Sequence, residues 1–163
     1  MIKPPTYQRV REVLDYDPDT GLFRWRVATG RRARVGAVAG ARHNQDYIHI
    51  GIDGHRILAH RLAWLWMTGS WPIAEIDHIN KDRSDMRWSN LRQASHAQNG
   101  ANRGANKNNK LGIKGVRFNH GSFYARIWKD GRQIKLGRFR TAKEATAAYL
   151  MAARELHREF CYA

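Results

Sequence analysis

The chain has 163 residues and a formal net charge of +15 at pH 7, from 29 lysines and arginines against 14 aspartates and glutamates. Its length suits one domain or two small ones, and such a charge excess is typical of proteins that bind a polyanion, most often nucleic acid. Six tryptophans and six tyrosines supply core material, which excludes a simple disordered basic tail. A basic membrane-surface protein would need a long amphipathic helix rich in lysine and arginine, and the sequence has none.

The number of cysteines and the lengths of the apolar runs indicate the cellular compartment of the protein. The single cysteine, Cys161, excludes a disulfide framework and a Cys-x-x-Cys zinc knuckle. The N-terminal residues Met1–Pro5 lack an apolar signal region, and no run of 18 apolar residues occurs. We therefore expect a cytoplasmic protein without a membrane partner.

Residues 1–58 predict a small β-rich region. In chain order we expect a helix over 7–14, a turn over 17–21, a strand over 22–27 and a hairpin whose first strand covers 47–52. The hairpin prediction rests on isoleucines that alternate with other residues and on the turn-forming pair Asp53-Gly54.

Residues 59–104 predict a second domain, which begins with a helix. Apolar side chains recur at helical spacing from Ala59 to Thr68, and Gly69 is a natural C-terminal stop. The next segment, Glu75-Ile76-Asp77-His78-Ile79-Asn80, alternates as a half-buried strand does.

An acid beside a histidine in one strand raises the question whether the pair belongs to a catalytic or metal-binding site. Ser95 and Gln98 form a capping-box signal, which places Asn99 in the first turn of a short helix. Strands and helix would then bring Asp77, His78 and Asn99 together. Oxygen ligands can hold a divalent metal on a phosphate, and a neutral histidine can take a proton from water. An isolated Asp-His pair is more often a surface hydrogen bond, so the prediction depends on the whole set.

The set Asp77-His78, Asn90 within Ser-Asn-Leu-Arg, and Asn99 resembles the HNH nuclease motif in its Asp-His…Asn…Asn form. This motif is common in phage and intron-encoded endonucleases of the ββα-metal fold. The resemblance implies that His78 is the general base and that Asp77 and Asn99 bind Mg²⁺ or another divalent cation such as Mn²⁺. It implies that Asn90 braces the loop and orients His78. Met86 stands where the family often has asparagine, which we interpret as a loop variation.

A zinc site is the alternative use of the histidines in this region. It would draw on His60, His78 and His96, whose scatter along the chain and lack of cysteine partners disfavour it. We interpret His60 and His96 as structural histidines with satisfied hydrogen bonds.

Residues 105–112 predict a basic linker, rich in asparagine, glycine and lysine, and residues 113–163 predict a third domain. Residues 101–163 carry a net charge of +10, with 14 basic and 4 acidic residues, so this part is the denser polyanion binder. We expect three strands, 114–119, 123–129 and 133–139, followed by a helix from Thr141 with a capping box to Glu144.

Period-2 alternation gives the expected sheet one apolar and one basic face. The apolar face, which the helix would cover, is Val116, Phe118, Phe123, Ala125, Ile127, Ile134 and Leu136. The other face is Lys114, Arg117, Asn119, Tyr124, Arg126, Trp128, Gln133 and Lys135, with a bulge at Gly115. Arginine and glutamine on such a face can read guanine and adenine in a major groove. The alternative is a solvated cationic sheet face.

Residues 113–160 resemble the plant ethylene-response-factor (Apetala-type) DNA-binding domain. The matching stretches are Gly115–Arg117, Phe123–Ile127, Leu136–Phe139 and Thr141–Ala145. The resemblance implies DNA contacts from six side chains of the sheet face: Lys114, Arg117, Arg126, Trp128, Gln133 and Lys135. Lys135 stands where tryptophan is usual, so the resemblance supports fold and groove more than target sequence.

The sequence thus predicts an α+β protein with a ββα-metal nuclease core and a C-terminal three-stranded antiparallel sheet packed on one helix. The order of the two resemblances looks like phage-type homing endonucleases. It implies a metal-dependent endonuclease that nicks one strand of double-stranded DNA as a monomer or weak dimer, in the host cytoplasm if phage-encoded. The rivals are a non-catalytic transcriptional regulator with a degenerate nuclease domain, and an RNA-binding protein. Intact Asp77, His78 and Asn99 disfavour the regulator.

Overall fold

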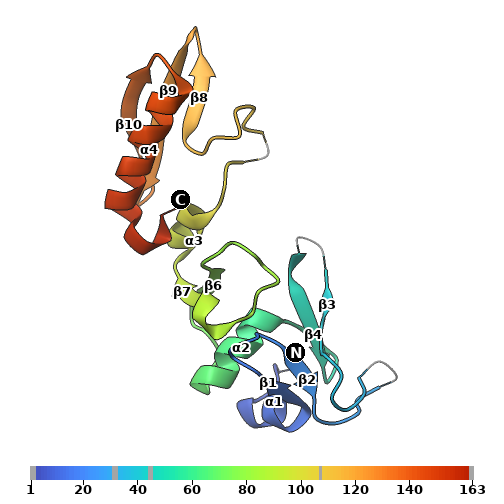
Figure 1. The fold of residues 1–163 in the computed structure, drawn as a ribbon. Helices are drawn as coiled ribbons and strands as arrows, with labels where there is room; N and C mark the ends of the chain where they lie inside the picture. Colours follow the sequence, from blue (N-terminus) through green and yellow to red (C-terminus); the bar gives the residue numbers. More distant parts are fainter. Residues whose placement is uncertain (1–2, 31–32, 44–45, 107, 162–163) are drawn as a thin grey trace. The chain divides into compact units, whose positions relative to one another are not determined.

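The computed structural model describes residues 3–30, 33–43, 46–106 and 108–161 (Figure 1). The chain forms two compact units, Met1–Gln93 and Ala94–Ala163, and each is described by itself. The division falls inside the segment 59–104, which the sequence assigns to one domain. No helix among the described ranges is both long and apolar enough to cross a membrane.

The first unit is built from short strands and two helices. Its elements are α1 (Tyr7–Val13), β1 (Leu14–Tyr16), β2 (Phe23–Trp25), β3 (Ala41–Arg42), β4 (Ile48–Ile52), β5 (His55–Leu58), α2 (Ala59–Thr68), β6 (Glu75–His78), the 3₁₀ turn η2 (Trp88–Asn90) and β7 (Leu91–Ala94). β1 pairs with β2, β4 lies between β3 and β5, and β6 pairs with β7. The predicted hairpin and helix are confirmed: Asp53 and Gly54 turn with φ of 48° and 80°, and Gly69 ends α2 with φ of 76°.

One hydrophobic core joins the N-terminal strands to α2 and β6. Its buried members are Val10, Val13, Leu14, Tyr16, Phe23, Trp25, Ala33, Ala39, Ile50, Ile52, Ala59, Leu62, Ala63, Leu65, Ile76, Met86 and Leu91. Val10, Phe23 and Ile50 therefore pack in one core with Ile76 and buttress the strand that carries Asp77 and His78. Met86 is 4% exposed within this core, which explains an apolar residue in an otherwise polar loop.

The second unit packs a sheet on a helix. Its elements are α3 (His96–Asn102), β8 (Val116–Asn119), β9 (Ser122–Lys129), β10 (Arg132–Phe139), α4 (Ala142–His157) and the 3₁₀ turn η3 (Arg158–Phe160). The strands are antiparallel in the order β10-β9-β8, and both predicted capping boxes, Ser95–Gln98 and Thr141–Glu144, are present. Figure 1 shows α4 lying along this sheet.

The register places apolar and basic residues of the predicted sets on opposite faces of the sheet. Val116 pairs with Ala125, and the three residues that α4 buries belong to the same core as these two: Ala145, Tyr149 and Ala153. Arg126 pairs with Lys135 and Trp128 with Gln133 on the opposite face. The apolar face is only partly covered: Phe118 is 55% and Ile134 37% exposed, and Leu136 falls in a bulge between Lys135 and Gly137.

Gly115 allows β8 to begin against α4. Its φ is +72°, and a Cβ built there would collide with the Tyr149 ring and lie 2.6 Å from the Arg126 carbonyl oxygen. The predicted irregularity at Gly115 is therefore a close approach that only glycine permits.

We expect Gly115→Ala to destabilise the second unit by roughly 1–3 kcal/mol beyond the strain of a left-handed alanine, because the new methyl overpacks the sheet–helix core. Gly112→Ala is the matched control, since Gly112 has φ of +65° but open space around its Cβ position. Chemical denaturation of both variants measures the difference. Equal free energies of unfolding would contradict the proposed packing.

Candidate functional site

β6 carries Asp77 and His78 into the protein. Ile76, Asp77 and His78 are 6%, 5% and 4% exposed, so three consecutive residues are buried. The predicted half-buried strand is wrong in this respect, because groups on both sides of β6 cover it. Burial makes charge compensation and hydrogen bonding decisive for both polar side chains.

Asp77 forms a buried ion pair with Arg92 of β7. The Nε and Nη2 atoms of Arg92 both donate to Oδ2 of Asp77, at 3.0 and 2.8 Å. The two side chains are 6% and 14% exposed. Sequence reasoning missed Arg92 as a site residue; its place next to Asn90-Leu91 on the strand paired with β6 was the available signal.

Two aromatic rings lie beside His78. The ring of His60 from α2 lies 5.1 Å away between centroids at 86°, and the ring of Tyr47 lies 6.2 Å away. Burial lowers the pKa of His78, against the opposing effect of Asp77. A neutral imidazole at pH 7 has the protonation state that a general base needs.

His60 is a buried partner of His78. Burial, and then the neighbouring His78, lower its pKa to about 3. Its Nδ1 atom is buried and makes no hydrogen bond among the described residues. The prediction that His60 is a structural histidine with satisfied hydrogen bonds is therefore wrong for this atom.

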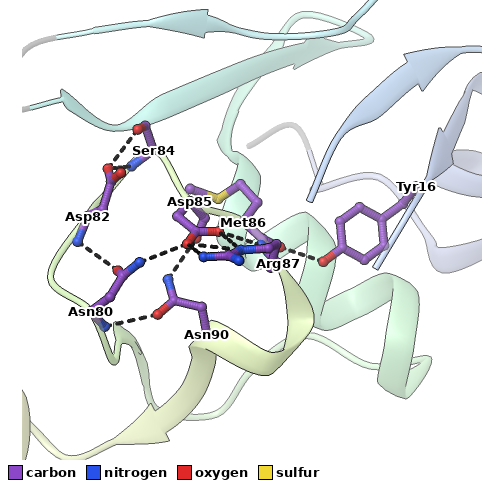
Figure 2. Close-up of polar contacts among 8 residues, drawn as sticks. All are labelled: Tyr16, Asn80, Asp82, Ser84, Asp85, Met86, Arg87 and Asn90. Atoms are coloured by element: carbon purple, nitrogen blue, oxygen red, sulfur yellow. Dashed lines mark hydrogen bonds and ion pairs between the residues drawn. The ribbon is translucent and has the colours of Figure 1, made fainter. Parts of the chain in front are cut away.

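Asn90 holds the loop that follows β6 (Figure 2). Its Oδ1 accepts from the Asn80 N–H at 2.9 Å, and its Nδ2 donates to the Asp85 carbonyl at 3.0 Å. Its own carbonyl accepts from the Ile79 N–H at 2.9 Å, directly after His78. These bonds support the predicted bracing of the loop.

An ion pair and hydrogen bonds hold the same loop, residues 79–87. The Asp85 carboxylate accepts from Asn80 Nδ2 at 2.7 Å and pairs with Arg87, which lowers the pKa of Asp85 to about 2 (Figure 2). The Tyr16 hydroxyl donates to the Met86 carbonyl at 2.5 Å. The loop is thus tied both to Asn90 of η2 and to the N-terminal core.

The metal prediction rests on Asp77 and Asn99. Asn99 lies half-buried in α3 of the second unit. A carboxylate and an amide oxygen fit Mg²⁺, which prefers oxygen ligands and retains several waters. The zinc alternative gains no support, because within the described ranges no cluster of three or more His, Cys, Asp or Glu could hold a metal ion.

The predicted DNA-contact residues do not all share one role. Arg117, Arg126, Trp128, Gln133 and Lys135 are exposed, Trp128 by 57%. Lys114 instead donates through Nζ to the carbonyls of Gly100, Ala101 and Arg103 at 3.1, 2.6 and 2.5 Å. Its ammonium ties the end of α3 to the start of the sheet, and its predicted DNA contact stays a prediction.

The basic face borders a groove that sequence reasoning missed. A hollow of about 830 Å³ lies along β8 and β9 within the second unit, and its lining includes Arg103, Lys110, Arg117, Arg126 and Trp128. Arg138, which pairs with Tyr124 across β9 and β10, adds a further cation to the basic face.

Comparisons with known proteins point to one motif. Residues 58–101 match a family model described as HNH endonuclease, and this segment holds Asp77, His78, Asn90 and Asn99. The HNH resemblance of this segment is therefore confirmed.

Whole-chain comparisons add little to this match. A solved chain titled "DNA binding and cleavage by the HNH homing endonuclease I-HmuI" is 16% identical, with a TM-score of 0.47 over 96% of this chain and 92% of that one. Among curated proteins, none matches the chain. The ethylene-response-factor resemblance of residues 113–160 stays a prediction.

His60 makes folding stability depend on pH. Because its pKa falls from 6.5 to about 3 on folding, the unfolded chain binds the proton first, and stability decreases as the pH falls from 6.5 toward 3. Between pH 7 and pH 5 this amounts to roughly 2 kcal/mol. Urea denaturation at both pH values measures the loss of unfolding free energy between pH 7 and pH 5, and this loss should be smaller in His60→Gln than in wild type by roughly 2 kcal/mol. An equal loss in wild type and variant would contradict a buried neutral histidine at position 60.

Proposed function

We propose that this protein is a metal-dependent DNA endonuclease that hydrolyses a phosphodiester bond. The observation that carries the proposal is the buried Asp77-His78 pair on β6, beside the loop held by Asn90, inside the segment that matches the HNH endonuclease family. The alternative is a DNA-binding regulator with a degenerate nuclease domain. The intact pair and its neutral imidazole favour the enzyme.

His78 has the role of general base. A neutral imidazole takes the proton from the attacking water, and general-base catalysis of this kind contributes a factor of about 10²–10⁴. His60 and Tyr47 restrict the ring of His78, and Asn90 fixes the backbone directly after it. These contacts limit the directions in which the base can point.

We propose that Asp77 of the first unit is a ligand of the divalent cation, Mg²⁺ or Mn²⁺, and the HNH resemblance assigns Asn99 as a second ligand. When bound, the cation supplies positive charge to a nonbridging phosphate oxygen and to the leaving 3′ oxygen. The side chains contribute oxygen ligands of the type that such hard cations prefer. Each chain contributes one such set, so we propose that a monomer nicks one strand.

The C-terminal sheet would direct the enzyme to its substrate. The face of the three-stranded sheet that would enter a major groove, in line with the ethylene-response-factor resemblance, exposes Arg117, Arg126, Trp128, Gln133 and Lys135. The basic segment 105–112 would follow the phosphate backbone. If about six phosphates are neutralised, affinity should fall with salt at a log–log slope near −5.

The first test is cleavage of supercoiled plasmid in the presence of Mg²⁺. Wild type should give nicked circles, EDTA should abolish the reaction, and His78→Ala should slow it by about 10²–10⁴-fold. Ser89→Ala, an exposed neighbour of Asn90 in η2, is the matched control and should cleave as wild type.

Two outcomes would contradict the proposal. Cleavage that survives His78→Ala would remove the assigned base. Intact plasmid despite tight duplex binding would favour the regulator instead.

The second test distinguishes substitutions that weaken DNA binding from substitutions that destabilise the fold. Arg126→Ala should weaken binding to the cognate duplex by roughly 1–3 kcal/mol if the side chain reads a base, without lowering the melting temperature. Lys143→Ala is the control, since Lys143 is exposed on α4 rather than on the sheet face. Lys114→Ala should chiefly lower the melting temperature, because it loses its bonds to α3. Equal binding by Arg126→Ala and Lys143→Ala would contradict a role for the sheet face.

A further inference from the structure

The ion pair between Arg92 and Asp77 occupies the carboxylate that the proposed function assigns to the metal. The guanidinium donates two hydrogen bonds to Oδ2, and both side chains lie largely out of solvent. A buried carboxylate without a compensating cation is strongly unfavourable. Arg92 therefore supplies the positive charge that compensates the buried carboxylate of Asp77.

A divalent cation at Asp77 would meet this guanidinium as a like charge. Charges in a buried site are screened little by solvent or salt, so the two cations oppose each other through the shared carboxylate. By thermodynamic linkage, the free energy by which Arg92 weakens metal binding equals the free energy by which the metal weakens the pairing of Arg92 with Asp77. Removing the charge of Arg92 should then tighten metal binding.

Neighbouring arginines are committed to other groups. Arg83 lies over the Tyr47 ring with its Cζ 4.8 Å from the centroid, and Arg87 pairs with Asp85. Arg92, by contrast, pairs with Asp77. Arg87 offers a matched control, because it is an arginine in a bidentate carboxylate pair on the adjoining loop.

We propose that Arg92 is an internal counter-cation for the metal site. It neutralises and positions Asp77 in the metal-free protein, and it must share or release that carboxylate when a divalent cation binds. The metal affinity is thereby set below that of an Asp77 without a competing cation. The inference rests on the proposed function insofar as Asp77 is a metal ligand.

The test is Mn²⁺ binding to the full chain, followed by the electron paramagnetic resonance signal of free Mn²⁺. Arg92→Met, which keeps length and removes charge, should bind Mn²⁺ at least about fivefold more tightly than wild type. Arg92→Lys and Arg87→Met should stay near wild type, and Asp77→Ala should lose the site. Equal or weaker binding by Arg92→Met would overturn the inference.

Failures of the two proposals are distinguishable. If Mn²⁺ binding to wild type does not depend on Asp77, the metal assignment fails and the role of Arg92 falls with it. If binding needs Asp77 but does not tighten in Arg92→Met, only the counter-cation role is overturned.

A measurement on the wild type covers the case in which Arg92→Met does not fold. The Nε–H resonance of Arg92, assigned by its loss in Arg92→Lys, should shift on saturation with Mg²⁺ because the pair with Asp77 is broken or shared. A resonance that stays unchanged while Mg²⁺ binds would overturn the inference.

Discussion

The burial of two adjacent polar side chains on one short strand is the constraint on which the first unit depends. Asp77 and His78 point to different partners, and each needs its own compensation: an arginine for the carboxylate, and an apolar, aromatic surrounding that keeps the imidazole neutral. Both solutions use burial, which strengthens an ion pair and disfavours a charged histidine at the same time. A solvent-exposed strand with the same residues would leave Asp77 hydrated and His78 largely free of this bias.

The loop after β6 shows how the N-terminal region contributes to the site. Met86 enters the core while its carbonyl accepts from Tyr16, and a Cβ at Gly21 would lie 2.5 Å from the Arg87 nitrogen. The loop therefore packs on the N-terminal turn as closely as backbone allows. Asn90 fixes its other side, so the segment after His78 is held from two directions (Figure 2). Residues 1–58 are in this sense part of the support of the site.

Turns and helix ends could be predicted from the sequence, whereas side-chain contacts between separate elements could not. The Asp53-Gly54 turn, the Gly69 helix end and the capping boxes depend on a few neighbouring residues, and the structure confirms them. The pairing of Arg92 with Asp77 depends on how β7 lies beside β6, and the contact of His60 with His78 depends on how α2 packs. The bonds of Lys114 were unreadable for the same reason: alternation assigned it to a face, and its ammonium also reaches carbonyls at the end of α3.

Gly115 decides which side chains the C-terminal sheet presents. Its carbonyl accepts from the Arg126 N–H at 2.8 Å, and its missing Cβ leaves room for the Tyr149 ring. The alternation that follows turns Val116 toward α4 and Arg117 away from it. A slip by one residue would exchange the two faces, because side chains of a strand alternate with period two. The close contact with Tyr149 opposes such a slip, so the packing of the apolar face also fixes the composition of the basic one.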